Sequence, residues 1–197
     1  MRVTGGEFGG LRLDVPKTDA VRPTQDRVRE ALFSMVQTEI AGARFLDLFA
    51  GSGAVGLEAL SRGAAAATFV EKDARHLAVL KANLERILRG RVGAATVVRA
   101  EVYRWLETYA GAGFELAFAD PPYALGEERG YAAVLRTLAE RGVIAPGGLF
   151  IAEMTAVQRA EATPGWVLVR DRTYGKTRLC LWRRTDGNEG GCDEQKN

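Results

Sequence analysis

Two short segments of the chain combine residue types that could bind a ligand and act on it chemically. The first is Asp47-Leu-Phe-Ala-Gly-Ser-Gly53, whose two glycines permit a tight turn and let a ligand approach the backbone. The second is Asp120-Pro-Pro-Tyr123, in which a carboxylate precedes two prolines and an aromatic ring. Each segment follows a short apolar run typical of a buried strand. We therefore expect both at the carboxyl edge of one sheet, where open α/β sheets bind their ligands.

The glycine-rich segment is compatible with two kinds of cofactor. Residues Gly51–Gly56 match the pattern G-x-G-x-x-G, and Glu71 follows twenty residues after Gly51, which is the spacing of a dinucleotide-binding site. A small nicotinamide-dependent reductase therefore stays open as an alternative. Asp47 favours S-adenosylmethionine instead, because a carboxylate four residues before the glycines suits a cationic amino-acid end. A pyrophosphate at that point would prefer neutral amides or a positive field.

For S-adenosylmethionine, the positions along the chain suggest a division of roles. We expect Asp47 to support the ammonium group, and Glu71, at the end of the second strand, to accept both ribose hydroxyls. The residues that follow the third strand should flank the adenine. The expected cofactor-binding residues are Asp47, Phe49, Ala50, Gly51, Ser52, Gly53, Glu71, Lys72, Ala100, Glu101 and Asp120.

The Asp120-Pro-Pro-Tyr123 segment could hold an exocyclic amine. Its two prolines fix an extended backbone and remove two N–H donors, which leaves carbonyl groups to accept. The Asp120 carboxylate and the Pro121 carbonyl could then accept both hydrogens of an –NH2 group and aim its lone pair at the methyl group of a sulfonium. Tyr123 offers a ring for base stacking, worth about 1–3 kcal/mol. We expect Asp120, Pro121, Pro122 and Tyr123 to catalyse methyl transfer to a nucleic-acid base.

The elements that must position these residues alternate from Arg44 onward, as in a parallel sheet with crossover helices. Strands are predicted at Arg44–Phe49, Thr68–Glu71, Ala95–Arg99, Glu115–Ala119, Leu149–Met154, Trp166–Arg170 and Arg178–Trp182. Helices are predicted at Ala54–Ser61, Ala74–Leu88, Val102–Tyr109 and Tyr131–Glu140, with capping glycines at 63, 90 and 142. No helix separates the last two strands, so they should form an antiparallel hairpin near Tyr174–Gly175. The fold class is α/β: a Rossmann-like methyltransferase fold with a mostly parallel seven-stranded sheet.

Residues 1–43 differ from the rest and are expected to form a small N-terminal extension. Glycines separate two extended runs, Arg2–Thr4 and Leu11–Val15, which predicts a hairpin. A helix is predicted at Gln25–Ile40, with Thr24 as its N-cap and Asp26 in its first turn. The chain should therefore divide into an extension (1–43), a methyltransferase domain (44–184) and a disordered tail (185–197).

Composition narrows the classes of protein further. Hydrophobic residues make up 47% of the 197 residues and charged residues 26%, as in soluble globular proteins. No apolar run approaches the ~20 residues that span a bilayer, and the N-terminus lacks the apolar core of a secretory signal, so we expect a cytoplasmic protein. Two cysteines and one histidine favour neither a disulfide framework nor a metal site.

Positive charge is concentrated near the end of the chain. The segment Arg170–Arg184 carries six basic residues and a single acidic one, whereas the whole chain has a net charge of only +2. Such a segment fits a surface that faces phosphates, although a merely solvated basic face is almost as compatible. The expected RNA-binding residues are Arg22, Pro23, Thr24, Arg27, Arg172, Lys176 and Arg178.

At this point the chain resembles a known family, the bacterial small-subunit ribosomal RNA guanine-N2 methyltransferases. The matching pieces are Arg2-Val-Thr-Gly-Gly6, Arg22–Phe33, Leu46–Arg62, Asp120-Pro-Pro-Tyr123 and the basic end near Tyr174–Trp182. The glycine loop and Asp-Pro-Pro-Tyr mark a broad class of amino methyltransferases, while Arg22–Phe33 is the specific part. Relatives also carry phenylalanine at position 123, and either ring can stack.

The resemblance implies a substrate and a partner. The family uses S-adenosylmethionine to modify a guanine amine in 16S ribosomal RNA, guanine-966 in the usual numbering of that RNA, within an assembled or nearly assembled small subunit. It also implies that Arg22, Pro23 and Thr24 form a loop beside the cofactor and substrate. Two further alternatives stay open: a DNA adenine-N6 methyltransferase, which uses the same motif but usually carries an added recognition region, and a non-enzymatic RNA-binding module.

Overall fold

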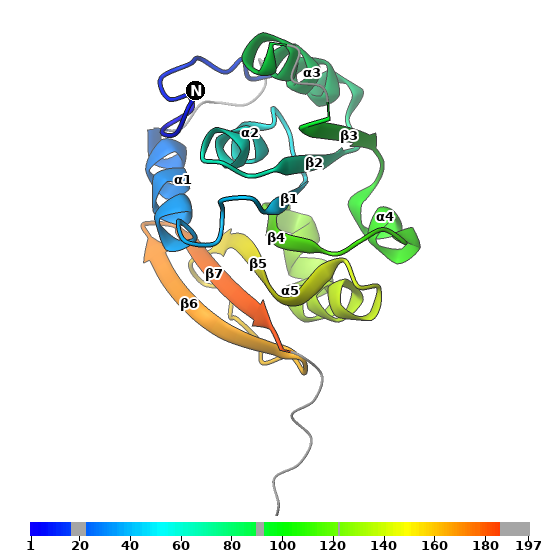
Figure 1. Cartoon of the computed structure of the whole chain (residues 1–197). Helices are drawn as coiled ribbons and strands as arrows, with labels where there is room; N and C mark the ends of the chain where they lie inside the picture. Colours follow the sequence, from blue (N-terminus) through cyan, green and yellow to red (C-terminus); the bar gives the residue numbers. More distant parts are fainter. Residues whose placement is uncertain (17–22, 90–92, 122, 186–197) are drawn as a thin grey trace, which may run out of the picture.

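A computed structural model describes residues 1–16, 23–89, 93–121 and 123–185 (Figure 1). Its helices are α1 (Pro23–Met35), α2 (Ala54–Ser61), α3 (Ala74–Leu88), α4 (Val102–Thr108) and α5 (Tyr123–Glu140). Its strands are β1 (Arg44–Leu48), β2 (Ala66–Glu71), β3 (Ala95–Arg99), β4 (Phe114–Ala119), β5 (Ile144–Thr155), β6 (Trp166–Tyr174) and β7 (Thr177–Arg184). None of the helices in these ranges is long and apolar enough to cross a membrane.

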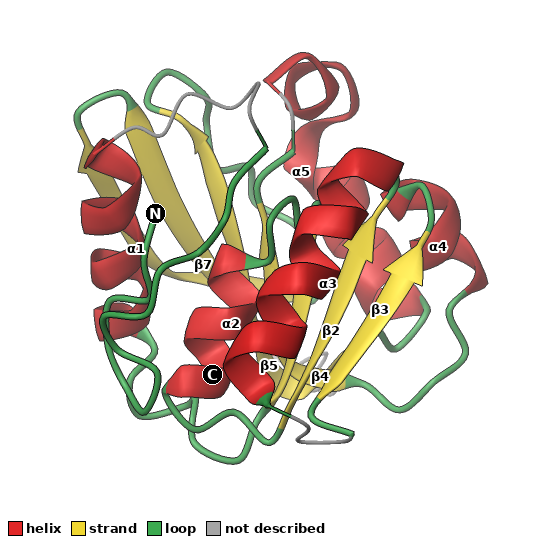
Figure 2. Ribbon diagram, turned by 90° about the horizontal axis from the view of Figure 1, so that it is seen from above, coloured by secondary structure: helices red, strands yellow, loops and turns green. Residues whose placement is uncertain are grey.

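The strands form one sheet in the order β3-β2-β1-β4-β5-β7-β6. Neighbours from β3 to β5 are parallel, whereas β7 pairs antiparallel with both β5 and β6. Helices α1, α2 and α3 cover one face of the sheet, and α4 and α5 cover the other (Figure 1). Figure 2 shows α2 and α3 over the parallel strands and α1 beside the antiparallel end. The predicted α/β fold with its C-terminal hairpin is confirmed.

The predicted elements of the main domain all form, and the differences lie at their ends. The last three strands extend further than predicted. The residues added to β6 and β7 are mostly polar, and those added to β5 include Pro146 and two glycines, so none of them gives an apolar strand signal. Helix α5 begins at Tyr123 and not at Tyr131, since glycines at 126 and 130 hide its first turns from a propensity argument. The turn between β6 and β7 consists of Gly175, at φ 61°, and Lys176.

Two of the three predicted capping glycines follow their helices in a left-handed conformation. Gly63 has φ 100° and Gly142 has φ 64°, values at which a side chain would be strained. At the end of α3 the left-handed residue is Arg89, with φ 42°. The predicted cap at Gly90 lies outside the described residues, as does the tail beyond Thr185.

The prediction for the first helix is wrong at both ends. Helix α1 begins at Pro23, so Thr24 lies within its first turn and does not cap it. Proline is favoured at the first helical position because its missing N–H would have no intrahelical partner there. The helix ends at Met35, and the residues up to Ile40 form turns. Asp26 lies in the first turn, as predicted.

The N-terminal hairpin exists in a reduced form without regular strands. Its one antiparallel bridge joins Arg2 and Arg12, and the Val3 amide donates to the Leu11 carbonyl at 3.0 Å. The buried side chains of Val3, Phe8 and Leu13 join the core on the face that α1, α2 and α3 cover. The segment is thereby fixed against the same face of the sheet as α1.

A buried ion network ties this segment to α2. Glu58 is 0% exposed and accepts from the Thr4 amide and hydroxyl, both at 2.7 Å. The same carboxylate accepts from Arg29 Nε of α1 at 3.2 Å and from Arg62 Nε at 2.8 Å. Four donors from three parts of the chain therefore converge on one buried charge, and the Arg29 guanidinium also donates to the Arg2 carbonyl.

Candidate active site

A cleft lies at the carboxyl ends of β1, β4 and β5, on the side of the sheet that α1 covers. It encloses about 900 Å³ when its open mouth is included. Its walls come from the glycine loop, from the strand ends, from α1 and from the N-terminal segment. The lining residues are Met1, Val15, Pro16, Arg29, Leu32, Asp47, Phe49, Ala50, Gly51, Ser52, Ala54, Val55, Phe118, Asp120 and Glu153.

The loop between β1 and α2 is held in a conformation that few residues adopt. Phe49 has φ 61°, although it is not glycine, and its ring packs edge-on against Tyr103 at 5.8 Å. Such outliers cost about 1–3 kcal/mol and cluster at functional sites. Gly53 has φ 80°, and a Cβ there would lie 2.1 Å from Leu80 Cδ1. Beside Gly51 the space is open, so a ligand can approach its backbone.

Asp47 links this loop to the first turn of α2. Its side chain is only 2% exposed, and Oδ2 accepts from the Gly56 amide at 2.8 Å. Burial raises the pKa of Asp47 to about 8, and the nearby charges of Glu71 and Asp120 add to the shift. A carboxylate with such a pKa lacks a compensating cation. A positively charged ligand group in the cleft would supply one.

Glu71 supports the loop from the end of β2. Its Oε2 accepts from the Gly51 amide at 2.9 Å, and its Oε1 accepts from the Asp73 amide at 2.8 Å. Glu71 does not line the cleft itself, whereas Gly51, whose amide donates to the Glu71 carboxylate, does. The expected ribose contact therefore stays a prediction, although a carboxylate oxygen that accepts one hydrogen bond can accept a second.

The other expected adenosine contacts lie near Glu71. Lys72 is exposed directly after β2. The Ala100 amide donates to the Glu71 carbonyl at 3.1 Å, so the two strand ends are adjacent. The Glu101 carboxylate accepts from the Arg104 amide and so caps α4. The structure thus gathers these residues at one edge but outside the lining of the cleft.

Asp120 directly follows β4, and its side chain is exposed to the cleft. The surrounding protein limits hydration of this carboxylate and raises its pKa. Pro121 is buried among apolar side chains, including Phe49, which also lines the cleft. Pro122 and the Tyr123 side chain lie outside the described residues, so the stacking role of Tyr123 stays a prediction.

Two charged residues of the cleft were missed by the sequence reasoning. Glu153 of β5 lines the cleft beside Asp120, and burial together with the charge of Asp120 raises its pKa. The signal that could have found it is a single carboxylate in the apolar run Leu149–Met154, near the end of a strand parallel to β4. Arg29 also lines the cleft, although its guanidinium bonds Glu58 and Asp26.

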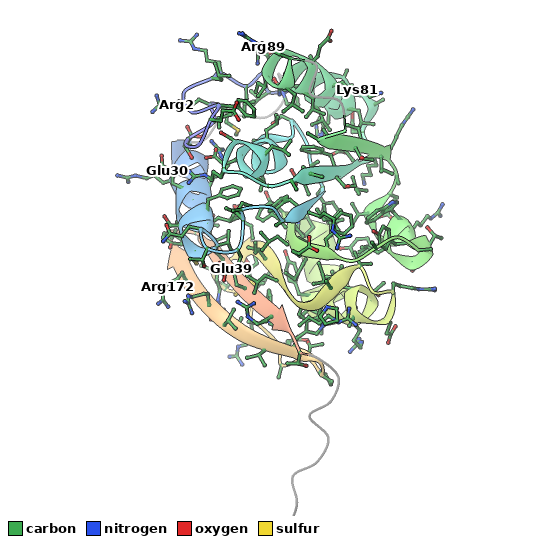
Figure 3. The ribbon with its side chains drawn as sticks, viewed as in Figure 1. Arg2, Glu30, Glu39, Lys81, Arg89 and Arg172 are labelled. Atoms are coloured by element: carbon green, nitrogen blue, oxygen red, sulfur yellow. The ribbon has the colours of Figure 1, made fainter. Side chains whose placement is uncertain are left out.

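The basic segment divides into exposed and internally paired residues. Arg170, Arg172 and Lys176 are exposed, and Figure 3 shows Arg172 pointing outward from β6. Arg178 instead binds Asp171 through two nitrogens, with Nε at 2.8 Å from Oδ1, and also donates to the Gln158 carbonyl. Its guanidinium is therefore occupied within the hairpin, which argues against the expected phosphate contact.

The expected RNA-binding residues near α1 are only partly described. Arg22 lies outside the described residues, and of Pro23 and Thr24 only the backbone is described, in the first turn of α1. Arg27 is exposed on that helix, whose other face helps to line the cleft through Arg29 and Leu32. The described part of the chain contains no group of three or more histidine, cysteine, aspartate or glutamate residues that could hold a metal ion.

Comparison with solved structures places this geometry among known proteins. A structure from Escherichia coli, described as a proposed methyltransferase, has a TM-score of 0.81 at 37% identity, covering 94% of this chain and 98% of that one. A hypothetical protein from Thermus thermophilus has a TM-score of 0.75, also at 37% identity, with 92% and 98% covered.

Comparison of sequences gives the same result. Residues 1–183 match the family described as Conserved hypothetical protein 95. The chain is 35% identical over 196 residues to ribosomal RNA small subunit methyltransferase D of Escherichia coli K12, covering 98% of this chain and 94% of the relative. It is 32% identical over 178 residues to the Haemophilus influenzae protein of the same name, with 89% of each covered. The chain therefore belongs to the ribosomal RNA small subunit methyltransferase D family.

Proposed function

We propose that this protein uses S-adenosylmethionine to methylate the exocyclic N2 amine of a guanine in small-subunit ribosomal RNA. Membership of the methyltransferase D family supports the substrate class. The observation that carries the choice of cofactor is the cleft itself, which three carboxylates line: Asp47, Asp120 and Glu153. We further propose guanine-966 as the target, within an assembled or nearly assembled subunit.

The charge of the cleft suits this cofactor better than a dinucleotide. S-adenosylmethionine carries a sulfonium and an ammonium group, and either would offset the raised pKa of Asp47 by stabilising its ionised form. A dinucleotide would bring a pyrophosphate toward the same carboxylates. The described lining offers it little compensation, because Arg29 is its one basic side chain there and Glu58 and Asp26 already pair with it.

In this proposal, different residues around the cleft bind different parts of the cofactor. Bound S-adenosylmethionine supplies a methyl group activated by the positive charge on sulfur. The loop Phe49–Gly53 and Asp47 would hold its amino-acid end, and Glu71 its ribose. Ala100 and Glu101, beside Glu71 at the end of β3, would flank the adenine.

Asp120 and the Pro121 carbonyl would hold the target amine. An exocyclic amine is a poor nucleophile because its lone pair is delocalised into the ring. Hydrogen bonds from its two N–H groups to these acceptors favour pyramidal nitrogen and aim the lone pair at the methyl group. Catalysis then rests on alignment and charge stabilisation, without a covalent intermediate.

Thermal-shift titration separates the two cofactor classes. Thermal unfolding of the protein would be followed during titration with S-adenosylmethionine, S-adenosylhomocysteine and NADPH. We expect the first two to raise the unfolding temperature and NADPH to leave it unchanged, since only ligands that bind the folded state stabilise it. Stabilisation by NADPH alone would favour the reductase alternative.

Replacing Glu71 with alanine is expected to weaken S-adenosylmethionine binding by about 1.5–3 kcal/mol, the range for hydrogen bonds to a charged group. The effect should combine loss of the ribose hydrogen bonds with loosening of Gly51, whose amide donates to this carboxylate. Isothermal titration calorimetry would measure it. Glu85→Ala is the matched control, because it removes a carboxylate that is exposed on α3 and does not line the cleft. Unchanged affinity in Glu71→Ala would remove Glu71 from the site.

Replacing Arg170, Arg172 and Lys176 together with alanine should weaken binding of the ribosomal substrate. It should also flatten the dependence of affinity on salt, by roughly one unit of log–log slope for each phosphate that the variant no longer neutralises. Affinity would be measured at several salt concentrations, with S-adenosylmethionine binding as the check on folding. Arg178 is unsuitable for this test because its removal would leave Asp171 unpaired. Equal slopes in variant and wild type would make this hairpin a solvated basic face.

Lys81→Ala with Arg89→Ala provides a matched control for charge. Both residues lie on or just after α3 at the opposite end of the molecule from β6 (Figure 3). Their replacement removes positive charge without touching the proposed surface, so we expect a smaller change in slope.

A further inference from the structure

Asp120 and Glu153 occupy matched positions on adjacent parallel strands. In the pairing of β4 with β5, Ala119 is the partner of Ala152. Asp120 is the residue after Ala119, and Glu153 is the residue after Ala152. Adjacent strands lie about 4.8 Å apart, and side chains at matched positions point to the same face of the sheet. Both side chains line the same cleft. The register therefore sets two carboxyl groups beside each other.

Among the residues that the structure describes, no cationic side chain forms an ion pair with Glu153 or Asp120. Asp47 of β1 lines the same cleft, and on α5 the Tyr131 hydroxyl donates to the Glu153 carbonyl at 2.7 Å, not to its carboxylate. The thiol of Cys180, on β7, is buried and uncharged, since burial raises its pKa to about 11. Met1 and Arg29 also line the cleft, and the Arg29 guanidinium is bonded to Glu58.

We propose that Asp120 and Glu153 act as one pair: when both are ionised, Asp120 accepts the proton that the amine releases during methyl transfer, and Glu153 then takes it up, so that the pair shares one proton after the transfer. The proposal rests on the proposed function. In this proposal Asp120 contacts the amine, and Glu153, on the neighbouring strand β5, receives the proton from Asp120 without contacting the amine. The electrostatics agree with the assignment: loss of hydration raises the pKa of Asp120 to about 6, and burial together with the charge of Asp120 raises the pKa of Glu153 to about 8.

The step balances as follows. The lone pair of N2 forms the new N–C bond while the C–S bond breaks, and the electron pair of that bond goes to sulfur, which becomes neutral. The nitrogen is then positively charged and loses one proton along its hydrogen bond to Asp120. A single carboxyl group would be neutral after this transfer and would no longer hold the amine by charge. With Glu153 beside it, the proton can move on, and Asp120 returns to its ionised form before the proton leaves through the open cleft.

The pH dependence of single-turnover methylation tests this pair. Wild type, Glu153→Gln and Glu153→Asp would be compared between pH 5.5 and 9 on undermethylated small subunits with saturating S-adenosylmethionine. We expect the wild-type rate to rise in two steps, near pH 6 and pH 8. Glu153→Gln should lose the upper step and fall by about 10²-fold at its plateau, the lower end of the range for a positioned proton acceptor. Glu153→Asp, which keeps a carboxyl group, should regain the upper step.

A second readout does not depend on activity. When the pKa of a carboxyl group is higher in the folded chain than in the unfolded chain, the free energy of unfolding falls as pH rises from the unfolded pKa to the folded pKa. The midpoint of urea unfolding should therefore fall for wild type between about pH 5 and 8, and fall less for Glu153→Gln.

The outcomes separate the proposal from the function on which it rests. An unchanged two-step rate profile in Glu153→Gln would overturn the proton role, as would a uniform slowing of both variants with no change in profile. If the wild type methylated no small-subunit RNA, the proposed function would fail. The unfolding measurement would still decide whether the two carboxyl groups share a proton.

Discussion

Asp120→Ala should reduce the rate of methyl transfer by roughly 10²–10⁴-fold, the range for a positioned acceptor of a reacting proton. The carboxylate follows β4 directly and faces the cleft, so its removal leaves the amine with the Pro121 carbonyl alone. The nitrogen lone pair would then lose its alignment with the methyl group. S-adenosylmethionine binding should be largely retained, because Asp47 and the glycine loop remain.

Asp120→Asn is the matched control for shape. Its amide oxygen can still accept one hydrogen bond, but it cannot take up a proton, so its rate should lie between those of wild type and Asp120→Ala. Tyr123→Ala should also be slow because the base loses its stacking partner, whereas Tyr123→Phe should be mild. Single-turnover rates and calorimetry on the same samples provide the measurement. Near wild-type turnover in Asp120→Ala would show that the amine is not held by this carboxylate.

Glu58→Ala should have the largest effect on stability, a loss of about 3–5 kcal/mol in the free energy of unfolding. Glu58 is fully buried and accepts from Thr4, Arg29 and Arg62. Its removal leaves Arg29, which is 4% exposed, without its buried partner. The N-terminal segment should loosen as well, and with it the wall of the cleft at Met1 and Val15. Urea unfolding monitored by circular dichroism would measure the loss.

Glu115→Ala provides the comparison for that loss. Glu115 pairs with Arg44 at 2.5 Å, but the two side chains are 43% and 41% exposed. Exposed pairs contribute about 1 kcal/mol or less, so this variant should unfold close to wild type. Equal losses in the two variants would mean that burial of the Glu58 network contributes little to stability.

The parts of the fold that follow local rules could be predicted from the sequence. Short apolar runs located the strands of the sheet, because strands that pack against helices bury their side chains. The two motifs could be placed at one sheet edge because each follows such a run, and the structure brings Asp47 and Asp120 into one cleft. The antiparallel end followed from the absence of a helix between Trp166 and Trp182.

Features that depend on partners distant in sequence could not be predicted in this way. The role of Glu153 comes from the register of β5 against β4, which no local pattern specifies. Arg178 counts as a basic residue in the sequence, but the register of β6 with β7 places Asp171 within reach of its guanidinium. From the sequence alone, Glu58 resembles a surface residue of a short helix. In the structure it is buried and accepts a hydrogen bond from Thr4, which lies 54 positions earlier.

The most direct test of the proposed function is the identity of the methylated nucleoside. Small subunits from cells that lack this activity would be incubated with the protein and isotopically labelled S-adenosylmethionine, and their RNA digested and analysed by mass spectrometry. Naked 16S ribosomal RNA and duplex DNA serve as comparison substrates. We predict one labelled N2-methylguanosine per subunit, formed by wild type and strongly reduced with Asp120→Ala. A labelled N6-methyladenine in DNA, or no labelled nucleoside in the small subunit, would contradict the account.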